Sequence, residues 1–91
     1  MGGRREATAK IVNKKGLHAR ASAKLVEAAS RFSSQITVTK DGQTVDARSI
    51  MGLMMLAASL DSVIEIVAVG TDCDEAMEAI LALVDAKFGE D

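Results

Sequence analysis

Residues 16–32 read GLHARASAKLVEAASRF, a turn followed by an amphipathic helix around which the rest of the chain can be arranged. Gly16 is a typical turn residue, and the apolar positions from Ala19 onward recur at helical spacing. These apolar positions are Ser22, Leu25, Val26, Ala29 and Phe32, while Arg20, Lys24, Glu27 and Arg31 are left for water. The stretch predicts a helix with one buried face, and it places His18, the single histidine of the chain, at the helix start.

His18 is a candidate phosphoryl acceptor because of this position. A neutral imidazole nitrogen is a good nucleophile near neutral pH, and its N-phosphoryl product passes the group on readily. The first turn of a helix offers unpaired N–H groups and the positive end of the dipole, which also disfavours the imidazolium form. Arg20 adds a planar guanidinium suited to phosphate. The alternative is an ordinary exposed or hydrogen-bonded surface histidine, and these five residues alone leave both interpretations open.

The regions on either side of this helix predict strands. Residues 6–12 alternate as a strand with Ala7, Ala9 and Ile11 on one side, and residues 13–16 form the loop into the helix. Asp41-Gly42 separates two short strands, 36–39 and 44–46, and is a strong signal for a two-residue hairpin. Residues 63–69, VIEIVAV, are apolar at almost every position, as expected of an interior strand that ends at Gly70.

Two more helices are expected in the second half of the chain. A short helix follows Ser49, which is a typical N-cap residue. The run Thr71–Asp74 fits a capping box that opens the last helix. The apolar stripe of that helix is Ala76, Ile80, Leu83, Val84 and Phe88. Helices on one face of a mainly antiparallel sheet define an α+β two-layer open-faced sandwich, in the order βαββαβα.

Composition narrows the functional classes. Ninety-one residues allow one domain with a small core, in which no enclosed cofactor site is expected. The single Cys73 excludes an internal disulfide and a cysteine-based zinc site, and no metal is expected. The first residues, MGGRRE, lack an apolar run, and Glu6 stands where a myristoylation pattern needs Ser or Thr. We therefore expect a cytoplasmic protein without membrane insertion.

Charge is distributed unevenly along the sequence. Residues 1–31 hold eight basic and two acidic side chains, a balance of +6, whereas residues 32–91 hold three basic and eleven acidic ones, a balance of −8. Arg20 and Lys24 share a helix face near His18, so the basic third favours steering of an acidic partner toward the acceptor. Nucleic acid is the other possible partner of a basic patch, but the aromatic side chains on which bases stack are missing.

The helix after Ser49 is rich in methionine. Ile50, Met51 and Met54 fall on a different side from Leu53 and Leu56, so one set can pack inward while the other stays exposed. Flexible, polarizable methionine suits a surface that docks on several partners. From the spacing alone, a helix whose apolar residues are all buried is about equally favoured.

These motifs, in this order, resemble the HPr family, the histidine-containing phosphocarriers of the bacterial phosphoenolpyruvate-dependent phosphotransferase system. The resemblance is carried by GLHARASAKLVEAASRF, by ITVTKDGQTVDARSIMGLMML and by the final amphipathic helix, and it covers nearly all of residues 6–88. It implies a single HPr-like domain over residues 1–91 with sheet order 1-4-2-3, strands 1 and 2 running parallel and joined by a right-handed crossover through the His18 helix. The KFGED and SIMGLMML segments are similar to the nitrogen-related, NPr-like branch.

The family resemblance also implies a function and a set of site residues. The protein would be a phosphoryl carrier rather than an enzyme, monomeric and without a cofactor, receiving the group from Enzyme I and passing it to an enzyme IIA-type domain in sugar uptake or nitrogen-related regulation. The group would be held on His18 Nδ1 by the Ala19 and Arg20 amides and the Arg20 side chain. Lys24, Ile50, Met51 and Met54 would bind partners, and a dedicated kinase would phosphorylate Ser49.

One residue departs from the family pattern, and one alternative function stays open. Most members carry proline after the arginine, where this chain has Ala21, so the first helical turn loses a fixed φ but gains an excellent helix former. The alternative is a regulatory binding module controlled by phosphorylation at Ser49, without transfer through His18. A small nucleic-acid-binding domain is a third possibility, which retention on DNA or RNA at moderate salt would reveal.

Overall fold

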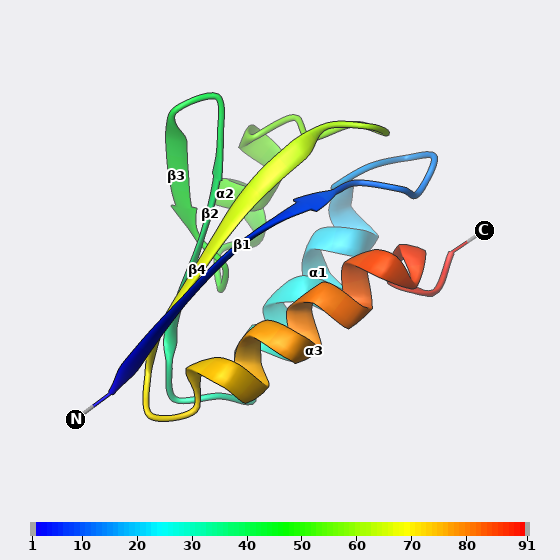
Figure 1. The fold of residues 1–91 in the computed structure, drawn as a ribbon. Helices are drawn as coiled ribbons and strands as arrows, with labels where there is room; N and C mark the ends of the chain where they lie inside the picture. Colours follow the sequence, from blue (N-terminus) through cyan, green and yellow to red (C-terminus); the bar gives the residue numbers. More distant parts are fainter. Residues whose placement is uncertain (1, 91) are drawn as a thin grey trace.

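A computed structural model describes residues 2–90 of the chain. It has the expected order of elements, with a short 3₁₀ turn added at the end (Figure 1). The elements are β1 (Gly3–Lys10), α1 (Ala19–Ala29), β2 (Gln35–Lys40), β3 (Gln43–Asp46), α2 (Ile50–Met55), β4 (Val63–Gly70), α3 (Cys73–Asp85) and η1 (Lys87–Gly89). The strands form one sheet in the order β1-β4-β2-β3, with every neighbouring pair antiparallel. The predicted α+β sandwich and strand order are confirmed.

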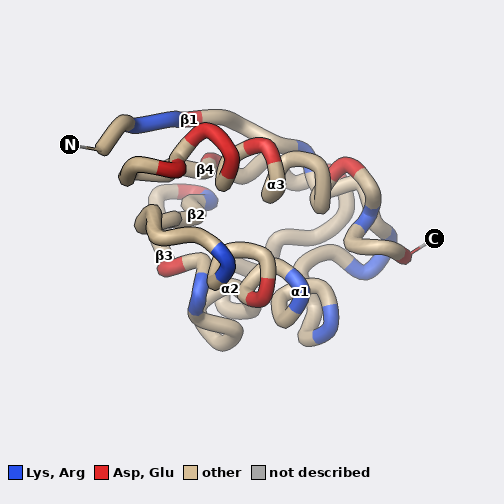
Figure 2. The backbone as a smooth tube through the Cα atoms, turned by 90° about the horizontal axis from the view of Figure 1, so that it is seen from below, with Lys and Arg blue, Asp and Glu red and all other residues tan. Residues whose placement is uncertain are grey.

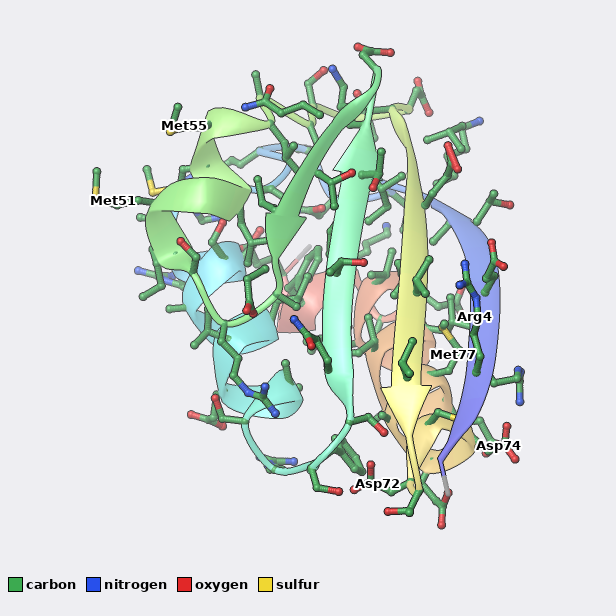
Figure 3. All side chains as sticks on the ribbon, turned by 90° about the vertical axis from the view of Figure 1, so that its left-hand side faces the viewer. Arg4, Met51, Met55, Asp72, Asp74 and Met77 are labelled. Carbon is green, nitrogen blue, oxygen red and sulfur yellow. The ribbon has the colours of Figure 1, made fainter. Side chains whose placement is uncertain are left out.

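The core lies between the sheet and the helices. In β4, the central strand that pairs with both β1 and β2, Ile64, Ile66 and Ala68 are buried, while Val63 and Val69 are exposed on the opposite face. The helices cover one face of the sheet and leave the other open (Figures 1 and 3). Both α1 and α3 carry buried stripes facing this core, as expected for amphipathic helices.

The predicted hairpin between β2 and β3 is confirmed. Asp41 and Gly42 both have positive φ, 51° and 80°, which is the backbone that a two-residue type I′ turn requires. Lys40 pairs with Gln43 directly beside the turn.

The first strand is longer than the sequence pattern indicated, since it begins at Gly3 rather than at Glu6. Its whole length pairs with β4, from Gly3 opposite Gly70 to Lys10 opposite Val63. The sequence does not reveal the extra residues because Arg4 and Arg5 are neither apolar nor alternating. Both are instead ion-paired, Arg4 to Glu6 and Arg5 to Asp74, each at 2.9 Å.

The capping box expected at Thr71–Asp74 is wrong. Asp72 stands at the N-cap position of α3, but its side chain makes no capping hydrogen bond. Its carboxylate accepts instead from the Ser33 and Ser34 amides, each at 2.9 Å, and from the Ser34 hydroxyl at 2.5 Å. Asp72 therefore ties the loop before β2 to the start of α3.

The last helix is also shorter than its apolar stripe suggested. It ends at Asp85, and Lys87 and Phe88 both adopt positive φ, 59° and 54°, in the turn that follows. Phe88 is fully buried all the same. The stripe therefore correctly marks Phe88 as a core residue, but the chain reaches that position by a reversal that brings the next residues back toward α1 (Figure 1). Within residues 2–90, no helix has the length and apolarity needed to cross a bilayer.

Candidate functional site

His18 occupies the N-cap position of α1, with extended backbone at φ −74° and ψ −177°. Its carbonyl accepts the Ser22 amide at 2.9 Å, which closes the first turn. The amides of Ala19, Arg20 and Ala21 precede that bond, so they belong to the first-turn donors that lack an intrahelical partner. The replacement of proline by Ala21 leaves the helix start in place, and Ala21 is fully buried.

The turn before His18 depends on Gly16. Its φ of +65° lies in the left-handed region, and its amide donates to the Asn13 carbonyl at 3.2 Å. The next amide, that of Leu17, donates at 2.8 Å to the carbonyl of Ala58, beyond α2. This bond fastens the histidine loop to the loop that follows the methionine-rich helix.

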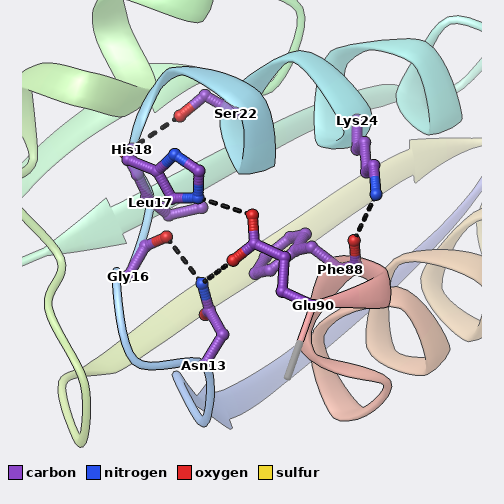
Figure 4. Close-up of polar contacts among 8 residues, drawn as sticks. All are labelled: Asn13, Gly16, Leu17, His18, Ser22, Lys24, Phe88 and Glu90. Carbon is purple, nitrogen blue, oxygen red and sulfur yellow. Dashed lines mark hydrogen bonds and ion pairs between the residues drawn. The ribbon is translucent and has the colours of Figure 1, made fainter.

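Glu90 contacts the His18 ring directly (Figure 4). Its Oε2 lies 2.6 Å from His18 Nε2, and the two side chains are 17% and 28% exposed. Burial raises the pKa of Glu90, but hydrogen bonds from Asn13 and His18 and the charges of His18 and Lys15 outweigh it and hold that pKa below its ordinary value. Because an ionised carboxylate only accepts, the Nε2 atom must carry the proton. The hydrogen bonds within residues 2–90 leave Nδ1 without a partner.

Asn13 holds the other side of the Glu90 carboxylate. Its Nδ2 donates to Glu90 Oε1 at 3.0 Å and to the Gly16 carbonyl at 2.9 Å (Figure 4). Asn13 is fully buried, and its Oδ1 has no partner within residues 2–90.

The segment that carries Glu90 is fixed at two points. The Phe88 side chain is fully buried in the core, and the Phe88 carbonyl accepts from Lys24 Nζ at 2.6 Å. Lys24, predicted as a partner-binding residue, is thus also a link between α1 and the turn after α3.

Four basic side chains surround the entrance to the site. Together with Gly89 and Glu90 they line a hollow of about 380 Å³, and they are Lys14, Lys15, Arg20 and Lys24. None of the four forms an ion pair within 4 Å inside residues 2–90, whereas Arg4, Arg5, Lys10 and Arg31 from the same basic third are all paired with carboxylates. The unpaired positive charge of residues 2–31 is therefore gathered around this hollow beside Glu90. Acidic residues are spread along α3 (Figure 2).

The methionine-rich helix exposes the face that its spacing indicated. Leu53 and Leu56 are buried, while Ile50, Met51 and Met54 are 40%, 75% and 44% exposed. The alternative of a fully buried set is excluded. Met55 is also exposed, which the pattern did not indicate, and with Met51 it points away from the molecule (Figure 3). Met54 and His18 line one shallow hollow, so this face adjoins the histidine.

Ser49 is the N-cap of α2, as predicted. Its Oγ accepts from the Gly52 amide at 2.9 Å. The neighbouring Arg48 reaches the other way, donating to the carbonyls of Phe32 at 2.6 Å and Ser34 at 3.2 Å.

The structure brings His18 together with two residues that the sequence analysis missed, Asn13 and Glu90. No local pattern marks them, because Glu90 lies 72 positions from His18 and 77 positions from Asn13. Arg20 and Lys24 lie with Glu90 around the basic hollow, and Met54 adjoins the histidine on the other side. Ser49 is at the start of α2, and no hydrogen bond within residues 2–90 joins its side chain to His18.

The fold and site define a class: a small open-faced sandwich that presents one histidine at a helix start, between basic side chains and an exposed apolar helix. A family model described as the PTS HPr component phosphorylation site matches residues 5–86. The chain belongs to the HPr family of phosphocarrier proteins.

Relatives and solved structures agree with this assignment. The chain is 54% identical over 80 residues to the phosphocarrier protein HPr of Cupriavidus necator, covering 88% of this chain and 90% of the relative. It is 46% identical to the phosphocarrier protein NPr of Shewanella violacea, with 88% of each chain covered. A crystal structure of HPr from Thermoanaerobacter tengcongensis superposes with a TM-score of 0.92 at 49% identity, covering 96% of this chain and 98% of that one.

Proposed function

We propose that this protein carries a phosphoryl group on His18, receiving it from phospho-Enzyme I and delivering it to an enzyme IIA-type domain. The observation that carries the proposal is the placement of the His18 ring at the start of α1. Nε2 donates to Glu90, and Nδ1 has no partner within residues 2–90. When the ring is neutral and Nε2 holds its proton, Nδ1 carries the free lone pair that can attack phosphorus.

The transfer needs no water and no added reactant. The Nδ1 lone pair forms a bond to phosphorus while the bond between phosphorus and the donor nitrogen of phospho-Enzyme I breaks, returning its electron pair to the donor. Delivery to the acceptor histidine repeats this exchange with the protein as donor. This chain alone turns over no free substrate, so we infer a carrier and not an enzyme.

The phosphoryl oxygens would be held by the helix start and by Arg20. The first-turn amides of Ala19 and Arg20 and the positive end of the α1 dipole favour an anion there. Arg20 lines the adjoining basic hollow, and its planar guanidinium suits a phosphoryl group held on His18.

Two surfaces beside the histidine suit partner proteins. Exposed Ile50, Met51 and Met54 offer an adaptable apolar face, and the basic hollow offers charge for acidic partner residues. Because the same face serves donor and acceptor, the protein exchanges partners instead of binding both at once.

The test mixes the protein with Enzyme I and labelled phosphoenolpyruvate. We expect acid-labile, base-stable label on the wild type and none on His18→Ala, whose circular dichroism should stay native. Absence of label with the cognate Enzyme I would remove the carrier function and favour the regulatory alternative. Unfolding of His18→Ala would show that the histidine is structural.

Ser49 supports a second, regulatory candidate function. A phosphate on its Oγ would stand at the start of α2, among the exposed Ile50, Met51 and Met54 side chains, and would place negative charge in a surface meant for acidic partners. We expect Ser49→Asp to fold normally and to accept phosphate from Enzyme I more slowly than Ser49→Ala. Mass spectrometry of the protein from its native cells, in different carbon and nitrogen regimes, tests for the modification and for a kinase. Consistent absence of phosphate at Ser49 would count against it.

The downstream acceptor separates the sugar-uptake branch from the nitrogen-related branch. Relatives carrying the names HPr and NPr each align over 88% of the chain. Comparing delivery to a sugar-specific and to a nitrogen-regulatory IIA domain would assign the branch.

A further inference from the structure

We propose that Glu90, held in place by Asn13, is a positioning residue that fixes the proton of His18 on Nε2 and so directs phosphorylation to Nδ1. This inference rests on the proposed function, which assigns the reaction to His18. It adds a residue that acts through the histidine without touching the phosphoryl group.

Both oxygens of the Glu90 carboxylate accept hydrogen bonds. Oε2 takes the Nε2 proton of His18 at 2.6 Å, and Oε1 takes the Asn13 amide at 3.0 Å (Figure 4). A carboxylate held from both sides can neither rotate freely nor withdraw from the ring. It therefore restricts the orientation of the imidazole as well as its tautomer.

Glu90 makes this contact although other cations are near. Lys14, Lys15, Arg20 and Lys24 line the same hollow, and a glutamate in such surroundings could pair with any of them. Within residues 2–90, its ion pair within 4 Å is with His18. The Phe88 anchor and the Lys24 bond to the Phe88 carbonyl set the backbone so that the side chain reaches the ring.

Asn13 is a buried link between the turn before His18 and Glu90. Its Nδ2 donates both of the bonds that form this link, and its Oδ1 has no protein partner within residues 2–90. Turning the amide over would not help, because Oδ1 would then face two acceptors, the Gly16 carbonyl and Glu90. Nδ2 must therefore face these two acceptors, and its two bonds connect the turn before His18 to the Glu90 carboxylate.

The arrangement has a chemical consequence during transfer. When Nδ1 forms its bond to phosphorus, positive charge develops on the ring while Nε2 keeps its proton. The Glu90 carboxylate is already placed against that charge. Since Nε2 and Nδ1 lie on different edges of the ring, the incoming group approaches away from Glu90.

The first experiment observes the proton. In ¹⁵N-labelled protein, at a pH high enough to keep the imidazole neutral, the wild type should show a downfield, slowly exchanging Nε2–H resonance. Glu90→Ala should lose it, and Glu90→Gln should retain it in part, because an amide oxygen accepts the same bond without the charge. Glu78→Ala is the matched control, since it removes an exposed glutamate on α3.

The second experiment measures the rate at which Enzyme I phosphorylates each variant. We expect Glu90→Ala to be slower by roughly tenfold, with Glu90→Gln between it and the wild type and Glu78→Ala unchanged. If the wild type accepts label and Glu90→Ala accepts it at the same rate, the positioning role is overturned while the carrier function stands. A wild-type Nδ1–H tautomer would also overturn it. A wild type that accepts no label from its cognate Enzyme I refutes the carrier function itself.

Discussion

Arg20 is the side chain best placed to help His18 bind phosphate without being part of the fold. It is exposed, lines the basic hollow and makes no ion pair within residues 2–90. Arg20→Ala should therefore slow phosphorylation of His18, on the order of tenfold, without abolishing it, since the helix amides remain. Arg20→Lys should restore part of the rate, as it keeps the charge but not the planar fork.

Initial rates with Enzyme I and labelled phosphoenolpyruvate check this expectation. Arg31→Ala is the control, because Arg31 is an exposed arginine just beyond α1 whose contact is with Glu27. Equal rates for Arg20→Ala and wild type would mean that the backbone amides alone bind the phosphoryl oxygens.

Gly16 is the residue whose substitution should disturb the site through the backbone. Its φ is +65°, and an added Cβ would overlap the Ala58 carbonyl oxygen and lie 2.8 Å from Ser59 Cα. Gly16→Ala should destabilise the protein by about 1–3 kcal/mol, as expected for a strained backbone position. Urea unfolding gives the value, and Gly42→Ala is a comparison with positive φ but open space around it. A smaller loss at Gly16 than at Gly42 would contradict the steric argument.

At the scale of the elements, Asp72 joins α3 to the loop before β2, and this contact depends on pH. Hydrogen bonds from the Ser34 hydroxyl and the Ser33 amide lower the pKa of Asp72 from 3.8 to about 2. A carboxylate with a depressed pKa contributes stability that is fully present above its unfolded pKa and is lost as the pH falls toward the folded one. Asp72→Asn should thus be less stable than wild type at neutral pH, with a difference that shrinks between about pH 4 and about pH 2.

Urea unfolding at several pH values across that window checks this. Asp74→Asn is the control, because Asp74 is an exposed neighbour paired with Arg5 at the surface. A difference that stays constant down to about pH 2 would mean that the ionised carboxylate is not what holds the loop.

The short helix α2 has one buried and one exposed face, and we expect the exposed face to serve docking. Met51 is 75% exposed and Leu53 fully buried, only two positions apart. Met51→Ala should raise the KM for phosphoryl donor and acceptor proteins and leave stability within about 0.5 kcal/mol. Leu53→Ala should cost about 2–5 kcal/mol of unfolding free energy. Transfer kinetics and urea denaturation of both variants test these two expectations. An unchanged KM for Met51→Ala would exclude Met51 from the docking face.

The elements show which features the sequence can predict. The Asp41-Gly42 turn and the Ser49 cap can be predicted because each depends on neighbouring residues. The turn needs two adjacent residues with positive φ, and the cap needs a hydroxyl three positions before the amide that it binds. Asp72 was misassigned because its partners lie 38 and 39 positions away. Glu90 was missed for the same reason, since its approach to His18 depends on a reversal at Lys87 and Phe88 that helical periodicity does not encode.

For the molecule as a whole, the separation of charge matters most. Four basic side chains without carboxylate partners within residues 2–90, Lys14, Lys15, Arg20 and Lys24, line the hollow beside Glu90. Acidic residues are spread along α3 (Figure 2). The rate of encounter with an acidic Enzyme I surface should fall as ionic strength rises. Lys15→Gln should be slower at low salt and less sensitive to salt, whereas Lys40→Gln, in the β2–β3 hairpin, should behave like wild type. Stopped-flow transfer rates at several salt concentrations measure this, and salt-independent rates would refute steering.

The two ends of the described chain lie at opposite ends of the molecule (Figure 1). Gly2 precedes the first residues of β1, far from the histidine, while Glu90 contacts the His18 ring itself. For anyone preparing this protein, an affinity tag or fluorophore attached after residue 91 would sit next to the group under study and could alter its reactivity. The same label attached before β1 would lie far from His18 and leave its chemistry unchanged. A fluorophore placed deliberately at the C-terminal end would report whether His18 is phosphorylated.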